Sequence, residues 1–282
     1  INYCQGSTAL PLTATALSNH TLNWYGTNAT GGVASTSAPT PSTASFGTIT
    51  YYVSQVSVVG CESPRAAILV TVNSTPSLPL VSPVAYCQNA TPTALTAILN
   101  GGTNLNWYGT NATGGTASAN APIPVTNTAG SIDYYVLQKS AANCEGPRAK
   151  ITVTVIAKPA APSVTSLAYC LGATSTPLTA TALSGATLNW YGTNATGGTA
   201  SASAPTPSLA TVGTVDYYVS QTLSGCEGTR SKLSVTTKDI PAKPTISRDA
   251  NGNLVSTAIT GNQWYKDGTL LSGITGTIYK PD

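Results

Sequence analysis

The sequence predicts an all-β protein made of three tandem β-sandwiches, and two observations carry this prediction. The nine residues Trp24–Gly32 recur unchanged as Trp107–Gly115 and as Trp190–Gly198. Self-similarity at a fixed long period indicates one folded unit that is used repeatedly. Each unit also contains short alternating or β-branched runs separated by Gly and Pro, and none has a sustained helical period.

Five segments of the first unit are predicted to be extended. The segment 22–25 alternates apolar and polar residues up to a turn rich in Gly, Asn and Thr. Leu22 and Trp24 should therefore face the core, and Tyr25 should face outward. The other four predicted strands are 11–17, 33–38, 47–55 and 67–72. The strand at 33–38 should be short and lie at a sheet edge, because a Pro-Thr-Pro break follows it.

Three tryptophans open the repeated stretch and are assigned to the core: Trp24, Trp107 and Trp190. An inward Trp on a central strand is an ordinary core residue. The alternative interpretation is a Trp that stacks on a ligand at the edge of a loop, which requires an exposed ring.

Proline-rich stretches separate the units and give the expected boundaries. The predicted domains are repeat one at 1–73, repeat two at 74–156, repeat three at 157–237 and a partial, divergent fourth repeat at 238–282. Pro at this density makes short, semi-rigid spacers, so we expect an extended array. The chain starts at Ile1 and ends at Asp282 inside the fourth unit. We therefore expect a piece of a larger processed protein, in which the first strand of repeat one is missing.

The composition excludes several classes of partner. Charged residues make up 7% of the chain, against roughly 25% in typical domains. The net charge of +3 is too small and too dispersed for binding to nucleic acid or to an anionic membrane. No run of 18 apolar residues occurs, so no membrane insertion by this segment is expected.

The segment from Gly47 to Val53 resembles the tyrosine corner of the immunoglobulin-like fold. Val53 stands where that fold has the second cysteine of its inter-sheet disulfide, and Leu12 stands about where it has the first. The resemblance implies that aliphatic packing replaces this disulfide.

The repeated motifs Tyr-Cys, Trp-Tyr-Gly-Thr, Ala-Pro-x-Pro, Tyr-Tyr-Val and Gly/Asn-Cys-Glu are similar to those of Ig-like repeats in large Bacteroidota cell-surface proteins. Such repeats occur in adhesins and in multidomain secreted proteins exported by the type IX secretion pathway. The resemblance implies an extracellular or cell-surface location.

Six cysteines occur as two per repeat, and six cysteines allow fifteen pairings. The repeat favours closure of each unit on itself, with the pairs Cys4–Cys61, Cys87–Cys144 and Cys170–Cys226. Each such loop of about 57 residues would contribute roughly 4 kcal/mol by the chain-entropy argument. A zinc site is rejected, because one His in the whole chain and two Cys per unit cannot make tetrahedral sites. Disulfides imply an oxidising compartment.

No catalytic arrangement is predicted. We expect that the protein is not an enzyme and that it binds no cofactor and no metal. Apart from cysteines, the side chains of repeat one that ionise near neutral pH are His20, Glu62 and Arg65, and the other repeats have no His. Neither a Ser-His-Asp triad nor a carboxylate pair for glycoside hydrolysis fits this composition. The segment 249–253 approaches a calcium-loop pattern, but no acidic residue closes it, and an Asn-Gly hairpin turn is predicted instead.

Two recurring sets of side chains are candidates for a ligand surface. Glu62 and Arg65 recur as Glu145/Arg148 and Glu227/Arg230. The favoured interpretation is a local ion pair worth about 0–1 kcal/mol, and the alternative is a recognition patch. The outward tyrosine pairs are Tyr25/Tyr52, Tyr108/Tyr135 and Tyr191/Tyr218. They either stack on sugar rings or stabilise the sheet as cross-strand pairs by roughly 0.2–1 kcal/mol.

The sequence thus predicts tandem immunoglobulin-like β-sandwiches arranged as an extended rod. The predicted function is a non-enzymatic structural or adhesive stalk that projects a functional region from the cell. The alternative is a carbohydrate-binding or spacer array of a secreted polysaccharide-degrading enzyme. The candidate partners are surface glycans or other cell-surface and secretion proteins.

Overall fold

The computed structural model describes residues 1–281, and these residues form strands and turns without any helix. Residue 282, the last of the predicted fourth repeat, lies outside the described residues. The described chain divides into two compact units. The first comprises Ile1–Lys158 together with Ser224–Cys226, and the second comprises the rest.

The first repeat is built on one four-stranded sheet with the order β1-β4-β3-β2. Its strands are β1 (Asn2–Cys4), β2 (His20–Trp24), β3 (Gly47–Ser57) and β4 (Ala66–Asn73). Strand β3 is antiparallel to both of its neighbours, and β1 is parallel to β4. The predicted strands at 22–25, 47–55 and 67–72 are confirmed, whereas β1 lies outside the predicted strands.

The two other predicted strands, 11–17 and 33–38, are wrong for the first repeat, because they form extended chain without a strand ladder. Ser35 makes an isolated bridge to Trp24, and the Leu12 N–H donates to the Pro39 carbonyl at 2.9 Å. Proline has no N–H and cannot extend a ladder. The sheet is therefore covered on its core face by extended loops that make only single bridges.

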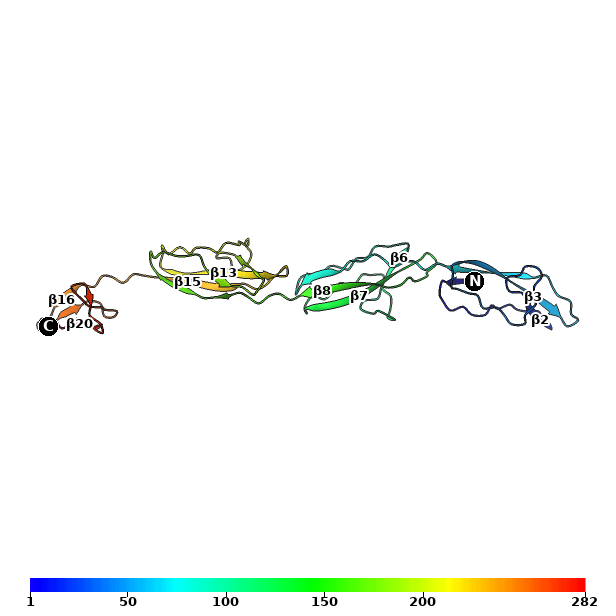
Figure 1. Cartoon of the computed structure of the whole chain (residues 1–282), viewed down its shortest axis with the longest axis horizontal. Helices are drawn as coiled ribbons and strands as arrows, with labels where there is room; N and C mark the ends of the chain where they lie inside the picture. Colours follow the sequence, from blue (N-terminus) through cyan, green and yellow to red (C-terminus); the bar gives the residue numbers. More distant parts are fainter. Residues whose placement is uncertain (282) are drawn as a thin grey trace. The chain divides into compact units, whose positions relative to one another are not determined.

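The second and third repeats have the same order, β5-β8-β7-β6 and β10-β15-β13-β12. The strands of the second are β5 (Val84–Cys87), β6 (Asn104–Trp107), β7 (Gly130–Lys139) and β8 (Ala149–Ile156). Those of the third are β9 (Ser163–Val164), β10 (Leu167–Cys170), β11 (Ala180–Thr181), β12 (Thr187–Trp190), β13 (Gly213–Leu223), β14 (Cys226–Glu227) and β15 (Ser231–Lys238). The long antiparallel pairs β7/β8 and β13/β15 lie side by side in their repeats (Figure 1).

The repeats share one register, so corresponding side chains face the same side of each sheet. Trp24 lies opposite Val53, and the counterparts Trp107 and Trp190 lie opposite Val136 and Val219. The three tryptophan side chains are 4%, 3% and 3% exposed. In the first repeat Leu12, Trp24 and Val53 belong to one apolar core cluster. Aliphatic packing therefore occupies the place of the inter-sheet disulfide.

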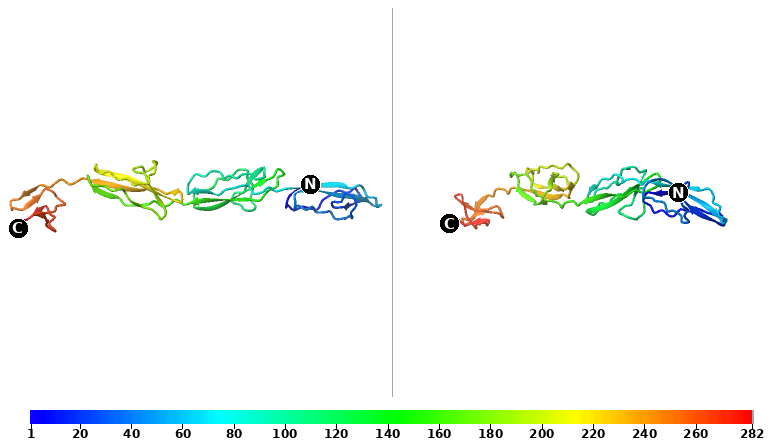
Figure 2. Two further views of the ribbon diagram at one scale, coloured as in Figure 1. Left: turned by 45° about the horizontal axis from the view of Figure 1, so that its top comes forward. Right: turned by 45° about the vertical axis from the view of Figure 1, so that its right-hand side comes forward.

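Residues 245–281 form a smaller β-structure, drawn in orange and red in Figures 1 and 2. Its strands are β16 (Ile246–Arg248), β17 (Leu254–Ser256), β18 (Tyr265–Lys266), β19 (Thr269–Leu270) and β20 (Ile278–Tyr279). The predicted hairpin turn at 249–253 is confirmed, because it joins the antiparallel strands β16 and β17. The Asp249 carboxylate accepts from the N–H groups of Asn251 and Asn253, both at 2.9 Å. Trp264 is buried against Tyr279.

Candidate functional site

The repeated nine-residue stretch forms a tight turn directly after the tryptophan strand. In the first repeat Gly26, Gly31 and Gly32 have φ values of 56°, 63° and 79°. The backbone N–H and the Nδ2 of Asn28 both donate to the Tyr25 carbonyl at 3.1 Å. A Cβ on Gly32 would lie 2.8 Å from the Asn28 side chain. The stretch therefore needs glycine there both for its left-handed backbone and for the close approach of Asn28.

An arginine covers the tyrosine that precedes this turn. The guanidinium carbon of Arg65 lies 3.3 Å from the centroid of the Tyr25 ring, and its Nη1 donates to the Asn28 carbonyl at 2.7 Å. This arrangement recurs as Arg148 on Tyr108 at 3.4 Å and Arg230 on Tyr191 at 3.3 Å. The cation over the ring face is an attractive contact. It also holds the turn, because the same guanidinium bonds the backbone of the turn.

Tyr25, Tyr108 and Tyr191 were predicted to face outward as part of a ligand surface, and their burial under the arginine contradicts the second part of that prediction. Their exposed fractions are 7%, 6% and 7%. The alternation of the strand does place each of them on the face opposite the buried tryptophan, but the arginine lies across that face. Their partners in the predicted pairs, Tyr52, Tyr135 and Tyr218, are half-buried.

A glutamate binds the hydroxyl end of the same tyrosine. The Tyr25 hydroxyl donates to the Glu62 carboxylate, which also accepts from the Ser54 hydroxyl. The counterparts are Tyr108 to Glu145 at 3.1 Å and Tyr191 to Glu227 at 2.6 Å. We call each of these three sets the Tyr–Arg–Glu cluster.

The predicted Glu–Arg ion pair is wrong in the first two repeats. Among residues 1–281, no ion pair joins Glu62 to Arg65, and Glu145 pairs with Lys139 at 3.2 Å. The two charged groups instead bind the ring face and the hydroxyl of one tyrosine. The sequence signal for this arrangement was present, because Tyr, Glu and Arg recur together in every repeat.

Several carboxylates are hydrogen-bonded in their charged form. The hydroxyls of Ser54 and Tyr25 lower the pKa of Glu62. On strands β7 and β13, Asp133 accepts from Thr152 at 2.7 Å and Asp216 accepts from Ser234 at 2.6 Å. These hydroxyls, and then Lys150 and Lys232, lower the pKa of both aspartates.

A group whose pKa is lower in the folded chain than in the unfolded chain stabilises the fold at pH values above its unfolded-state pKa. This contribution is lost as the pH falls through the pKa that the group has in the folded state. We therefore expect the melting temperature to be nearly constant from about pH 8 to about pH 5 and to fall below about pH 4, near the unfolded pKa of these groups. Asp133→Asn should flatten this acid limb, whereas Thr110→Ala, which replaces an exposed neutral side chain, should leave it unchanged. Calorimetry across this range measures the effect. An identical acid limb in both variants would contradict the assignment.

The linkers before the second and third repeats are bound to the repeat that follows them. Gln138 is fully buried, donates from Nε2 to the Ser77 carbonyl at 2.8 Å and accepts from the Asn100 N–H at 2.8 Å. Gln221 likewise donates to the Ala160 carbonyl at 2.7 Å. This role was not predicted from the sequence, although a Gln recurs at this position of every repeat.

Two glycines accept the backbone of these linkers. A Cβ on Gly146 would lie 2.5 Å from the Pro76 carbonyl oxygen, and one on Gly228 would lie 2.3 Å from that of Pro159. Ser63 occupies the equivalent position of the first repeat. The glycines thus allow the linker to lie directly on the hairpin.

We expect Gly146→Ala to destabilise the second repeat by about 1–3 kcal/mol, because the added methyl displaces backbone rather than a flexible side chain. The control is Ser37→Ala at an exposed position, which should change stability by less than about 0.5 kcal/mol. Urea unfolding of the two variants and the parent chain measures the difference. Equal midpoints for Gly146→Ala and the parent would mean that the linker is not held at this place.

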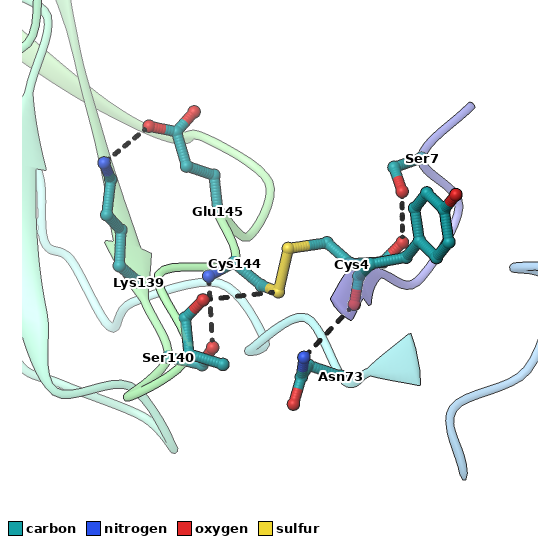
Figure 3. Close-up of a disulfide and its surroundings, with 9 residues drawn as sticks. Cys4, Ser7, Asn73, Lys139, Ser140, Cys144 and Glu145 are labelled. Atoms are coloured by element: carbon teal, nitrogen blue, oxygen red, sulfur yellow. Dashed lines mark hydrogen bonds and ion pairs between the residues drawn. A yellow bond between two sulfur atoms is a disulfide. The ribbon is translucent and has the colours of Figure 1, made fainter. Parts of the chain in front are cut away.

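Two disulfides join different repeats, so the predicted pairings within each repeat are wrong. Cys4 is bonded to Cys144 and Cys87 to Cys226, with Cα–Cα distances of 5.4 and 5.5 Å. Figure 3 shows the first of them, with the Lys139–Glu145 ion pair beside it. Cys61 and Cys170, for which the sequence predicts disulfides, are free and exposed. Ser224–Cys226 group with the first unit, to which the second disulfide ties them.

The strand order explains why the two cysteines of one repeat cannot form a disulfide with each other. Because β1 is parallel to β4, Cys4 lies beside Asn73 at the end of β4. Cys61 precedes the start of β4 at Ala66. A strand of this length rises by more than about 20 Å. A disulfide spans only about 4.4–6.8 Å between Cα atoms, so Cys4 and Cys61 lie at opposite ends of the sheet.

A surface hollow of about 440 Å³ lies beside the Tyr–Arg–Glu cluster of the first repeat. Its lining includes Tyr52, Glu62, Arg65 and residues 29–31 of the turn. Within residues 1–281, no three His, Cys, Asp or Glu side chains group together as metal ligands would. The same part of the chain contains no helix with the length and hydropathy of a membrane span.

Comparison with known proteins identifies an Ig-like family over most of the sequence. A family model described as "Ig-like domain CHU_C associated" matches residues 1–73, 76–156 and 159–238. Among solved structures, Drosophila N-cadherin EC1-3 is similar at 13% identity and a TM-score of 0.21, over 85% of this chain and 97% of that chain. Fibronectin(III)-like modules of Clostridium thermocellum CbhA are similar at 18% identity and a TM-score of 0.30, over 55% of this chain and 89% of that chain. No curated protein matches the sequence.

Proposed function

Because the chain belongs to the CHU_C-associated family of Ig-like domains, we propose that it is a non-enzymatic stalk of a bacterial cell-surface or secreted protein. The observation that carries the proposal is the pair of disulfides, each of which joins one repeat to the next. A stalk has to transmit force from one domain to the following one. A covalent bond at each of the first two junctions does this independently of noncovalent packing.

The bound linkers support the same role. Gln138 and Gln221 fix the backbone of the linker to the following repeat, and the glycines at 146 and 228 let that backbone approach closely. Prolines stiffen the same segments. Bound and stiff linkers favour an extended array in which each repeat mainly meets its neighbours.

The disulfides also support an extracellular or cell-surface location, because such bonds persist in oxidising compartments. We propose that adhesion, where it occurs, is performed by the region that the stalk presents. We also propose that a protein of this kind reaches the surface by the type IX pathway, which is the route that the sequence resemblance implies.

Small-angle scattering tests the stalk proposal directly. A single compact body of 282 residues has a radius of gyration of about 19 Å. We expect a value well above this for the oxidised chain, with a distance distribution that is skewed as in elongated particles. A value near 19 Å would reject the stalk proposal.

A carbohydrate-binding or spacer array of a secreted polysaccharide-degrading enzyme is the second candidate. The hollow beside Tyr52 favours it, because a half-buried tyrosine next to Glu62 and Arg65 offers a ring face and polar groups to a sugar. Glycan-array binding that is lost in Tyr52→Ala and kept in Phe46→Ala, which changes an exposed aromatic side chain outside the hollow, would support this role. No binding to plant, algal or bacterial polysaccharides would leave the hollow without a glycan role.

A further inference from the structure

The cysteines of the three repeats fall into two structural classes. The first-strand cysteines end the edge strand that is parallel to the last strand of the repeat: Cys4, Cys87 and Cys170. The hairpin cysteines lie between the two long antiparallel strands: Cys61, Cys144 and Cys226. Both disulfides join the first-strand cysteine of one repeat to the hairpin cysteine of the next. By this rule, Cys61 would form a disulfide with a first-strand cysteine, and Cys170 would form one with a hairpin cysteine.

The hairpin of Cys61 has the same local structure as the bonded hairpin of the second repeat. The Ser140 N–H donates to the Cys144 carbonyl at 2.9 Å, and the Cys144 N–H donates to Ser140 Oγ at 3.2 Å. The corresponding bonds between Ser57 and Cys61 measure 3.0 and 3.2 Å. The thiol of Cys61 is therefore held in the backbone geometry of its bonded counterpart, although Cys144 is buried and Cys61 is exposed.

The end of the first strand is also the same in the free and the bonded repeats. The residue after Cys170, Leu171, donates its N–H to the Lys238 carbonyl at 2.8 Å. Gln5 and Gln88 follow the bonded cysteines Cys4 and Cys87 and make the equivalent hydrogen bonds, both at 2.8 Å. Neither free cysteine needs a backbone rearrangement to adopt the bonded arrangement.

We propose that Cys61 and Cys170 are the two open ends of a disulfide ladder, and that each bonds the complementary cysteine of another Ig-like repeat of this kind. The proposal deepens the stalk function and rests on it, because it continues the covalent coupling beyond the three repeats. Cys61 and Cys170 differ from a reactive lone cysteine in one respect. The same positions in neighbouring repeats are seen bonded, always first strand to hairpin.

The reaction is a thiol–disulfide exchange with a small disulfide such as oxidised glutathione. The thiolate of Cys61 attacks one sulfur of the small disulfide, forms a mixed disulfide and releases one glutathione thiolate. The incoming first-strand thiolate then attacks the Cys61 sulfur and releases the second glutathione. The two protein thiols lose two electrons and two protons in total, and oxidised glutathione takes up both.

A chain extended at its N-terminus tests the proposal. Residues 74–166 are placed directly before Ile1, so that Ile1 takes the place that Leu167 has in the natural junction. After refolding in a glutathione redox buffer, the copy of Cys87 should be bonded to Cys61. Alkylation should then label only the copied Cys144 and Cys170, and non-reducing peptide mapping should show the new bond. In the Cys61→Ser variant the copied Cys87 should become alkylatable.

Repeat one has Ser63 at the position where Gly146 and Gly228 accept a linker in the other two repeats. The serine side chain could keep an added linker away from this hairpin. The extended chain is therefore also made with Ser63→Gly. An alkylatable Cys61 in both backgrounds, or a bond between the copied Cys87 and the copied Cys144, would overturn the proposal.

Oxidation of the natural, unextended chain shows whether the partner repeat belongs to the same polypeptide or to a second copy. If the natural chain stays monomeric with Cys61 and Cys170 alkylatable while the extended chain closes, the partner belongs to the same polypeptide, which gives a high effective concentration. Disulfide-linked dimers that map to Cys61–Cys170 would make a second copy the source. Dimers that map to Cys61–Cys61 would contradict the pairing of complementary classes. Scattering that rejects an elongated shape would leave these bonds intact, so the two proposals fail separately.

Discussion

Reduction of the two disulfides should more than double the fully stretched length of the chain. In the oxidised chain, a force applied at the termini passes from Cys4 to Cys144, back along the chain to Cys87, and across to Cys226. The segments 5–86 and 145–225 therefore carry no load. At about 3.5 Å per residue, the limiting length is about 400 Å when oxidised and about 1,000 Å when reduced.

Optical tweezers with handles at both termini measure this length with and without reductant. The informative control is Cys61→Ser. It should not change the oxidised length, because Cys61 is free. Closure of each repeat on itself would instead make this variant about 200 Å longer, since it would release a loop of about 57 residues. Equal lengths before and after reduction would show that the junctions are not covalently linked.

Replacement of Trp107 by Ala should destabilise the second repeat by about 3–5 kcal/mol, the cost of a large truncation in a packed core. The ring is 3% exposed and belongs to a cluster with Leu95, Val136, Ile151 and Val153. These neighbours come from the long strands and from the covering loop, so the cavity would lie between the sheet and its cover.

Chemical denaturation followed by circular dichroism measures the loss. Phe46→Ala is the matched control, because this aromatic side chain is 68% exposed, and we expect a change of less than about 0.5 kcal/mol. A loss below about 1 kcal/mol for Trp107→Ala would favour the alternative of a ligand-stacking tryptophan.

The sequence alone determined the features that depend on local pattern and on the period. The recurrence of Trp24–Gly32 indicated three copies of one unit, and alternation along 22–25 placed the tryptophan inward. The strands at 47–55 and 67–72 followed from β-branched and aromatic runs. The hairpin turn at 249–253 followed from its Asn-Gly pair. Each of these inferences needs only residues that are close together in the chain.

The tertiary structure decided where distant segments meet. Tyr25 is covered because Arg65, forty residues later, lies on its ring, and alternation says nothing of what covers a face. The loop at 11–17 has the alternation of a strand, but its partner segment contains prolines that cannot complete a ladder. The cysteine pairing depended on the parallel contact of β1 with β4, which local sequence does not indicate. That contact places Cys4 and Cys61 at opposite ends of one sheet, where a bond of fixed, short reach joins neighbouring repeats instead.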